Sequence, residues 1–262
     1  METNGLTWCV TGAAGRIGRV LRAHLSERGV PTVSLDVTEC APVGPEDRVL
    51  HCDLRHLPEL VAALRGCSGV VHLGGLPDEA DFHELADVNV VGTYHVLEAA
   101  RRAGSSRVVF ASSNRVTGSY PVSETVTPSD PPRPDGFYGV SKVAGESLCR
   151  LYADKFGLST ISVRIGSFEE RPEDVRHART WLSHADALRA FDAAMATEAH
   201  SAVFYAVSRN SERWWSLEEG EQLGFVPRDD AATFIGLGAL APDTPQGGPY
   251  AGPAHSLDRM RE

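Results

Sequence analysis

The stretch LTWCVTGAAGRIG, residues 6–18, decides the fold of this chain. Its first half, Leu6 to Thr11, is a short apolar run of the length that a buried strand needs. The run ends at GAAGRIG, residues 12–18, and apolar side chains then recur at helical spacing: Ile17, Val20, Leu21 and Leu25. The stretch therefore predicts a strand, a glycine turn and a helix, in that order.

Three glycines in this turn have the spacing of a phosphate-binding loop. Gly12 would permit the tight turn, Gly15 would let the backbone approach a pyrophosphate, and Gly18 would let the helix pack close to the strand. The positive end of the helix would then face the phosphates. Because such a triad also occurs in purely structural turns, its meaning depends on the residues that follow.

A carboxylate follows at the distance that a dinucleotide site requires. The next apolar run, Thr32 to Leu35, ends at Asp36, roughly 20 residues past the glycines, where an acidic side chain would hold an adenosine ribose hydroxyl. Asp36 would repel a 2'-phosphate, and no arginine directly follows it. The sequence therefore predicts NAD as the cofactor in preference to NADP.

Strands and helices alternate along the rest of the chain. We expect further strands at residues 49–52, 69–73, 107–111, 159–164 and 202–207, and helices at 56–65, 82–103, 137–156, 184–197, 216–222 and 229–235. This pattern predicts an α/β fold, a doubly wound parallel (Rossmann) sheet with a small C-terminal substrate lobe. We divide the chain into an NAD-binding domain (1–164), an integrated substrate-binding lobe (165–235) and a Pro/Gly-rich tail (236–262), which we expect to be extended or mobile.

Several predicted strand ends carry residues that suit a bound cofactor. Asp53–Leu54 follows the third strand, where an adenine ring could rest, and Gly74–Gly75 follows the fourth, where small residues let a ligand approach the backbone. We interpret His72 as a hydrogen-bonded strand-end histidine. Asn89 lies in the predicted helix 82–103, where a polar side chain on a packed face needs a partner.

A tyrosine and a lysine in the predicted helix 137–156 have the spacing of a catalytic pair. Tyr138 and Lys142 are four residues apart, so they share one face of the helix. The ammonium group would favour the ionised phenol, which could then act as a general base for a hydroxyl proton. Ser113, at the carboxyl end of the fifth predicted strand, is a candidate donor to the reacting oxygen.

Composition excludes several other classes of function. The chain has 262 residues with a formal net charge of −10, and it lacks the block of basic residues that would track nucleic-acid phosphates. Neither a signal peptide nor an apolar run long enough to span a bilayer is apparent, so we expect a soluble, cytoplasmic protein. Its five cysteines and ten histidines show no metal-ligand spacing, so we predict no metal site and reduced thiols.

Taken together, the motifs resemble those of a known superfamily. The glycines of residues 12–18, Asp36, Asp53–Leu54, Asn89, Ser113 and the Tyr138–Lys142 pair resemble the extended short-chain dehydrogenases/reductases. Within that superfamily, further strings resemble the uronate dehydrogenases: HLGG (72–75), FASSN (110–114), RPDGFYGVSK (133–142), VRIGS (163–167) and TWLSH (180–184). The resemblance covers residues 6–234, about the whole predicted fold.

This resemblance implies a reaction. A cyclic hexuronic acid, of glucuronate or galacturonate type, would be oxidised at its C1 hydroxyl to an aldarolactone while NAD is reduced. Tyr138 would take the hydroxyl proton, Lys142 would hold the nicotinamide ribose and lower the pKa of Tyr138, and Ser113 would bond the reacting oxygen. No nucleic acid or membrane partner is implied.

The resemblance also implies which residues contact each ligand. Substrate would be held by Ser113, by Asn114 and Ser167 at sugar hydroxyls, and by Arg176, whose guanidinium fork suits a carboxylate. The cofactor would contact Gly12, Ala14, Gly15, Arg16, Ile17, Gly18, Asp36, Asp53, Leu54, Leu73, Gly74, Gly75, Asn89, Tyr138, Lys142 and Ile165.

The chain departs from the uronate dehydrogenase pattern at two places. Where those enzymes commonly offer a serine hydroxyl to the substrate, this chain has Leu76–Pro77, and proline has neither a hydroxyl nor a backbone N–H. The segment 168–172 after Ser167 is acidic where an anion should bind. A different or modified uronic acid is therefore an alternative substrate.

Other readings of the same motifs stay open. A nucleotide-sugar epimerase or dehydratase would use bound NAD without net NADH, although it would need a larger C-terminal lobe. A regulatory protein that binds NAD without turnover would have no need for Tyr138, Lys142 and Ser113 together. We also expect a homodimer or higher homo-oligomer, because the helices 82–103 and 137–156 often pair between subunits in this superfamily.

Overall fold

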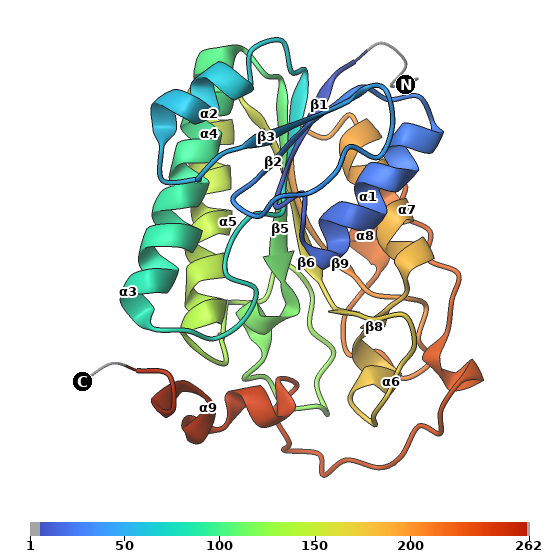
Figure 1. Cartoon of the computed structure of the whole chain (residues 1–262). Coiled ribbons are helices and arrows are strands. Elements are labelled where there is room, and N and C mark those ends of the chain that lie inside the picture. The colour runs from blue at the N-terminus through green and yellow to red at the C-terminus, as the bar shows by residue number, and fades with distance from the viewer. Residues whose placement is uncertain (1–5, 261–262) are drawn as a thin grey trace.

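One parallel sheet forms the centre of the molecule. The computed structural model describes residues 6–260, and its main sheet has seven strands in the order β3-β2-β1-β4-β5-β6-β9 (Figure 1). The strands are β1 (Trp8–Thr11), β2 (Thr32–Asp36), β3 (Asp47–His51), β4 (Gly69–His72), β5 (Arg107–Ser113), β6 (Ser159–Ile165) and β9 (Ser201–Ala206). All neighbouring strands are parallel, so the predicted doubly wound sheet is confirmed.

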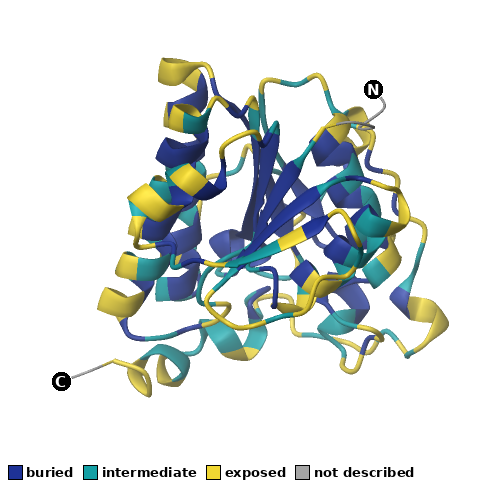
Figure 2. Cartoon of the chain, turned by 45° about the horizontal axis from the view of Figure 1, so that its top comes forward, coloured by how far each residue is buried: buried dark blue, intermediate teal, exposed yellow. Residues whose placement is uncertain are grey.

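Helices cover both faces of this sheet. On one face lie α1 (Arg16–Glu27), α7 (His184–Ala196) and α8 (Glu218–Gln222); on the other lie α2 (Leu57–Ala63), α4 (Gly92–Ala103) and α5 (Phe137–Phe156) (Figure 1). The inner strands β2, β1, β4, β5 and β6 are buried along nearly their whole length, whereas the edge strands β3 and β9 and the outward faces of the helices are partly exposed (Figure 2). Burial on both faces is why the strands read as continuous apolar runs rather than alternating ones.

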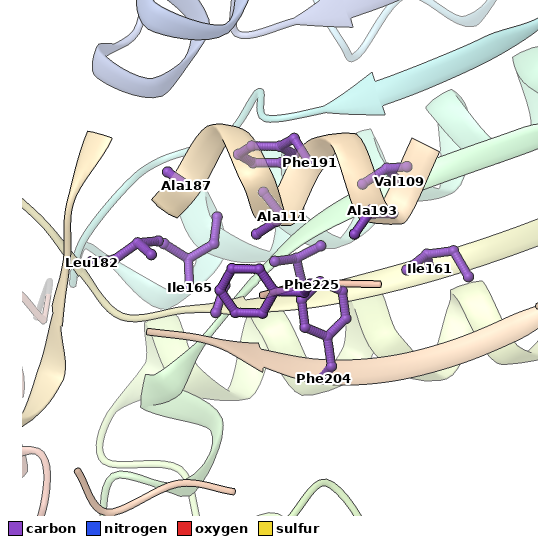
Figure 3. Packing of buried hydrophobic residues seen from close by; sticks show 14 of the residues in the cluster. Val109, Ala111, Ile161, Ile165, Leu182, Ala187, Phe191, Ala193, Phe204 and Phe225 are labelled. Atoms are coloured by element: carbon purple, nitrogen blue, oxygen red, sulfur yellow. The ribbon is translucent and has the colours of Figure 1, made fainter. Parts of the chain in front are cut away.

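Adjacent residues of one strand contribute to two different cores. Val109 of β5 packs in the core beneath α1 and α7, together with Ile161, Phe191 and Phe204 (Figure 3). Its neighbour Val108 belongs to the second core, under α2, α4 and α5. Side chains of a strand alternate between the faces of a sheet, so one apolar strand stabilises both layers at once.

The strand order reverses between β1 and β4. From β1 the chain proceeds outward through β2 to β3, and then returns to place β4 on the other side of β1. Thr11 at the end of β1 pairs with His72 at the end of β4, so the turns after both strands lie side by side. A reversal of this kind opens a crevice at the carboxyl ends of the strands, where ligands of such sheets bind.

The helix predicted over residues 82–103 is interrupted, which corrects the sequence interpretation. It consists of α3 (Phe82–Leu85), a π-helical turn η1 (Ala86–Val91) and α4. Asn89 lies within the π turn, and its side chain bonds both the Leu76 backbone and Ser141 of α5. Wider turns of this kind occur most often where a side chain must be redirected for function.

The C-terminal part contains short elements that the sequence places only in part. Beyond β6 lie β7 (Ser167–Phe168), α6 (His177–Thr180) and β8 (Trp181–Leu182), followed by α7, β9 and α8. The helix predicted over 229–235 is wrong, because only the 3-10 turn η3 (Ala231–Thr233) forms there. β9, from within the predicted lobe 165–235, is the edge strand of the main sheet, so the lobe is built onto that sheet.

The segment after Gly236 is more structured than its composition predicts. It forms the 3-10 turn η4 (Gly248–Ala251) and the helix α9 (Pro253–Leu257), and it runs along the lower edge of the molecule from below α6 to below α5 (Figure 1). Its backbone bonds that of residues 118–122 at three points. The expectation of an extended tail is therefore wrong for these turns, since polar backbone contacts rather than apolar periodicity hold them.

Candidate active site

The glycine turn after β1 has the geometry that a phosphate loop needs. Gly12 has a φ of +69°, and a Cβ there would lie 2.7 Å from the backbone nitrogen of Gly74. A Cβ on Gly18 would lie 2.2 Å from the carbonyl oxygen of Gly12, so only glycine lets α1 begin so close to β1. Gly15 is the N-cap of α1 and supplies no capping side chain, so the first N–H groups of this helix are left for a ligand.

Asp36 stands beside this turn, where the sequence places it. One carboxylate oxygen accepts the N–H of Ala14 at 2.9 Å, and the other accepts that of Thr38 at 2.8 Å. A cavity of about 490 Å³ opens next to Asp36, and the ends of β2 and β3 line it. The carboxylate is thus held in place at the mouth of a space that can take an adenosine.

Other predicted cofactor residues surround the same crevice. Gly74 donates its N–H to Thr11 Oγ at 3.1 Å, and the Leu54 side chain packs against it. The Asp53 carboxylate is bonded by Arg55, which lowers the pKa of Asp53 to about 2. Leu73 and Ile165 lie at the ends of β4 and β6. The described residues therefore fit a dinucleotide along this edge of the sheet.

The remaining predicted residues of the turn are engaged by the protein. Ile17 packs against the core under α1. The Arg16 guanidinium crosses to the C-terminal lobe, where it pairs with the Glu169 carboxylate and donates to the Phe168 carbonyl at 2.8 Å. This ion pair accounts for part of the acidic run after Ser167, because one of its carboxylates is neutralised by the glycine turn itself.

Two predicted polar residues act inside the fold. His72 bonds Thr11 Oγ at 2.8 Å and Thr93 Oγ at 3.1 Å, and burial lowers its pKa to about 3. The interpretation of His72 as a satisfied strand-end histidine is confirmed. Asn89 uses both amide hydrogens and its oxygen on Leu76 and Ser141, so it fixes the loop after β4 against α5.

The predicted catalytic residues meet in one buried place. Tyr138 and Lys142 lie on the same face of α5, with the Lys142 Nζ 5.6 Å from the centre of the Tyr138 ring. Lys142 donates to the Ala111 carbonyl at 3.0 Å, and burial lowers its pKa to about 8. Burial raises the pKa of Tyr138 to about 12, and a hydrogen bond with Ser113 acts against that rise.

The start of α5 depends on a residue that sequence analysis missed. Glu79, in the loop after β4, accepts the N–H groups of Phe137 and Tyr138 at 2.8 and 3.0 Å. A Cβ on Gly136 would lie 2.5 Å from this carboxylate, so glycine at the helix start makes room for a remote cap. Long sequence separation hides this contact, since nothing near Gly136 signals its partner.

The predicted substrate residues lie next to the catalytic group. Asn114 is buried, and its side-chain nitrogen has no hydrogen-bond partner among the described residues. Ser167 bonds Thr180 Oγ at 2.8 Å and accepts from Arg176 at 3.2 Å. The Arg176 guanidinium also donates to the Gln246 carbonyl at 2.9 Å, and within the described chain it has no carboxylate partner.

The C-terminal segment contributes to this site, which the sequence did not reveal. The Tyr250 ring lies between two guanidinium groups, 4.4 Å from that of Arg115 and 5.3 Å from that of Arg176. Arg115 follows Ser113 and Asn114 at the carboxyl end of β5. That position alone could have marked Arg115 as a site residue, whereas no local pattern points to Tyr250.

No helix among residues 6–260 is long and apolar enough to cross a membrane. No cluster of metal-ligating side chains appears in the same described part of the chain.

Comparison with known proteins places these features in a family. Residues 8–173 match the NAD dependent epimerase/dehydratase family. Uronate dehydrogenase of Agrobacterium fabrum is 42% identical over 226 residues, which cover 86% of this chain and 85% of that protein. A solved uronate dehydrogenase variant from Agrobacterium tumefaciens, complexed with NAD, is 37% identical with a TM-score of 0.87, covering 94% of this chain and 97% of that one.

A second solved relative extends the likeness along almost the whole chain. Glucuronic acid dehydrogenase of Chromohalobacter salexigens is 34% identical with a TM-score of 0.89, over 97% of this chain and 99% of that one. The family match covers more than half of the sequence, and it includes the glycine turn and the Tyr138–Lys142 helix. The chain therefore belongs to the NAD dependent epimerase/dehydratase family, and it is similar to the family's uronate dehydrogenases.

Proposed function

We propose that this protein is an NAD-dependent uronate dehydrogenase. It oxidises the C1 hydroxyl of a cyclic hexuronic acid to the aldarolactone. One observation carries the choice of substrate: Arg176 is a half-buried guanidinium with no carboxylate within ion-pair distance in the described chain, and it lies beside Ser167 in the site. A guanidinium partly withdrawn from water favours a directly bound anion, and the carboxylate of a sugar acid supplies one in the bidentate geometry that arginine favours.

The chain's own residues manage the proton in this reaction. In its ionised form, which burial disfavours and the Ser113 hydrogen bond favours, Tyr138 takes the proton of the C1 hydroxyl, while Ser113 bonds the same oxygen and keeps it aimed at the phenol. Lys142, buried on the same face of α5, binds the nicotinamide ribose and keeps a positive charge near the phenol. The unpartnered amide nitrogen of Asn114 donates to a sugar hydroxyl.

The cofactor supplies the oxidising step, since NAD accepts the hydride that leaves C1. The protein's part is to hold it. Gly12, Gly15 and Gly18 let the backbone come close to the diphosphate, and the Asp36 carboxylate takes the adenosine ribose and disfavours a 2'-phosphate. The remaining contacts predicted from sequence lie along the same edge, and the NAD complex of a similar enzyme supports this assignment.

Absorbance of NADH tests the proposal directly. Purified protein with NAD is offered glucuronate, galacturonate and neutral sugars such as glucose and arabinose. We expect NADH with the uronates alone, and Tyr138→Phe should abolish it while leaving NAD binding intact. Bound NAD that never accumulates as NADH would instead favour the epimerase or dehydratase reading, and NAD binding without any sugar conversion would favour a regulator.

We also propose a homodimer formed through two neighbouring helices. Large apolar side chains are exposed along α3 to α4 and along α5: Phe82, Val91, Tyr94, Val140, Leu151 and Phe156. Exposed apolar residues gathered on one face are typical of a protein interface. This surface, which we call the helical face, suits a second copy of the chain.

A further inference from the structure

Arg115 places a positive charge directly beside the catalytic tyrosine. Its guanidinium carbon lies 5.4 Å from the centre of the Tyr138 ring, and its side chain is only 7% exposed. A Cβ on Gly139 would lie 2.6 Å from the Arg115 carbonyl oxygen, so glycine at that position lets α5 approach this backbone. An arginine is charged at every accessible pH, so the charge beside the phenol is permanent.

Carboxylates from separate segments hold this guanidinium in place. Asp135 accepts from Nε at 2.6 Å, Asp78 accepts from a terminal nitrogen at 2.9 Å, and Glu79 lies 3.6 Å from the other. The Tyr250 ring of the C-terminal segment covers it at 4.4 Å. Arg115 therefore cannot swing away from Tyr138 without breaking contacts to the loop after β4, the loop before α5 and the C-terminal segment.

We propose that Arg115 is a positioning residue that fixes a positive charge beside Tyr138 and thereby sets the pH at which the phenol can act as a base. This inference rests on the proposed role of Tyr138. Arg115 touches neither the reacting oxygen nor the cofactor in this scheme, because it acts through the phenol. The half-exposed carboxylate of Asp78, which pairs with Arg115, opposes the effect of the Arg115 charge, since a negative charge favours the neutral phenol.

The directions of the interactions agree with this geometry. Burial raises the pKa of Tyr138, the Ser113 hydrogen bond and the Arg115 charge lower it, and Asp78 and Asp135 raise it. Other ionisable groups contact Tyr138 or its charged neighbours: Lys142 of α5 lies over the ring, and Glu79 accepts the Tyr138 N–H. From the C-terminal segment, Tyr250 lies against Arg115 and His255 against Asp78. Arg115 and Asp78 are thus two charges of opposite sign that can be removed separately.

The pH dependence of kcat/KM for uronate oxidation tests the inference. In Arg115→Gln, loss of the charge disfavours the phenolate, so the rising limb should move to higher pH by about one unit or more. In Asp78→Asn the limb should move to lower pH by about half a unit, because this carboxylate is partly screened by solvent. Arg115→Lys keeps the charge and should restore most of the wild-type position.

Arg133→Gln provides the matched control. Arg133 is an exposed arginine that stacks on Tyr120 at 4.7 Å, away from the catalytic phenol, so its loss should leave the profile unchanged. Shifts of opposite sign at Arg115 and Asp78 support the inference. The inference is overturned if the pH profiles of these variants are unchanged, or if activity falls at all pH values without a shift. If Arg115→Gln does not fold, the shift in Asp78→Asn alone decides the question.

A second readout separates this inference from the proposed function. The ultraviolet absorbance of tyrosinate is titrated in each variant and compared with the same variant carrying Tyr138→Phe, so that the difference reports Tyr138 alone. If no uronate is turned over, the proposed function fails, but the titration still measures whether Arg115 and Asp78 move the ionisation of Tyr138 in opposite directions. Identical titrations in all variants would overturn the role of Arg115 even in an active enzyme.

Discussion

In the proposed function, one guanidinium that forms no ion pair in the described chain, that of Arg176, would select a sugar acid over a neutral sugar. Arg176 is half-buried, desolvation lowers its pKa, and it donates to Ser167 and to the Gln246 carbonyl. Neutral hydrogen-bond partners of this kind orient the Arg176 guanidinium without cancelling its charge. An incoming carboxylate therefore gains a full ionic partner, whereas a neutral sugar of the same shape leaves the charge unpaired.

Arg176→Met tests whether this guanidinium binds the substrate carboxylate. Removing the cation should raise KM for glucuronate about 100-fold or more, corresponding to about 3 kcal/mol, with a smaller effect on kcat. Steady-state NADH formation measures both constants. Arg171→Met is the control, because Arg171 is exposed on the same segment and stacks on Phe234 at 6.0 Å. A normal KM in Arg176→Met would remove the carboxylate-binding role.

The site residues that the sequence predicts are those tied to local motifs. Tyr138 and Lys142 share a helix turn, and Asp36 follows a strand at a fixed distance from the glycines, so their spacings together single them out, although the Tyr138–Lys142 spacing is weak by itself. Glu79, Arg115 and Tyr250 have no such motif. Their contacts join segments 20 to 177 residues apart, as in the Arg115–Asp135 and Glu79–Ser256 bonds, and only folding brings these partners together.

Among the structural elements, the C-terminal segment differs most from what the sequence predicts. Gln246 is fully buried; its side chain donates to the carbonyls of Pro121 and Glu124, while its own carbonyl accepts from Arg176. Ser256 of α9 donates to Glu79, which caps α5. The segment therefore connects Arg176, at the proposed substrate end of the site, to the start of α5, which carries Tyr138.

Deleting residues 244–262 should separate substrate binding from the fold. The sheet and both cores lie outside this segment, so NAD binding and helical content should persist. Turnover of uronate should fall at least about 100-fold, because Arg176 and Arg115 both lose contacts. Circular dichroism, NAD titration and NADH formation measure the three quantities. Full activity in the shortened chain would contradict the role assigned to the C-terminal segment. The single variant Tyr250→Ala should show a smaller loss of uronate turnover.

Periodicity predicted the long elements better than the irregular ones. α5 and α7 begin and end within one residue of the predicted ranges 137–156 and 184–197, and α1 follows the glycine turn as predicted. The π turn at residues 86–91 was missed because its apolar residues continue the stripe of its neighbours. Its widened geometry is decided by the partners of Asn89, which lie in other parts of the chain.

For the whole molecule, the helical face defines how two copies would meet. Tyr94 of α4 and Leu151 of α5 are 40% and 47% exposed, and the two helices pack against each other on the sheet. Light scattering should give the mass of a dimer for the wild-type chain. The double variant Tyr94→Glu and Leu151→Glu should be monomeric, because two charges would be buried without partners at the interface.

A substitution away from that face controls for general effects of added charge. Val226 is 50% exposed and lies beyond α8, on the opposite side of the sheet, so Val226→Glu should remain dimeric. A monomeric wild-type chain would refute the dimer. A double variant that keeps the dimer mass would place the interface elsewhere.

The position of the C-terminal segment has a consequence for biosynthesis. A ribosome releases the segments for all seven strands before it releases Gln246 and Tyr250, since β9 ends at Ala206. An emerging chain can therefore assemble its sheet, and with it the cofactor crevice, while the sugar pocket is still incomplete. Because Trp215 and Phe225 belong to the core beside β9, a chain that stops after Phe225 and before Gln246 would contain all seven strands but lack the residues that contact Arg176 and Arg115.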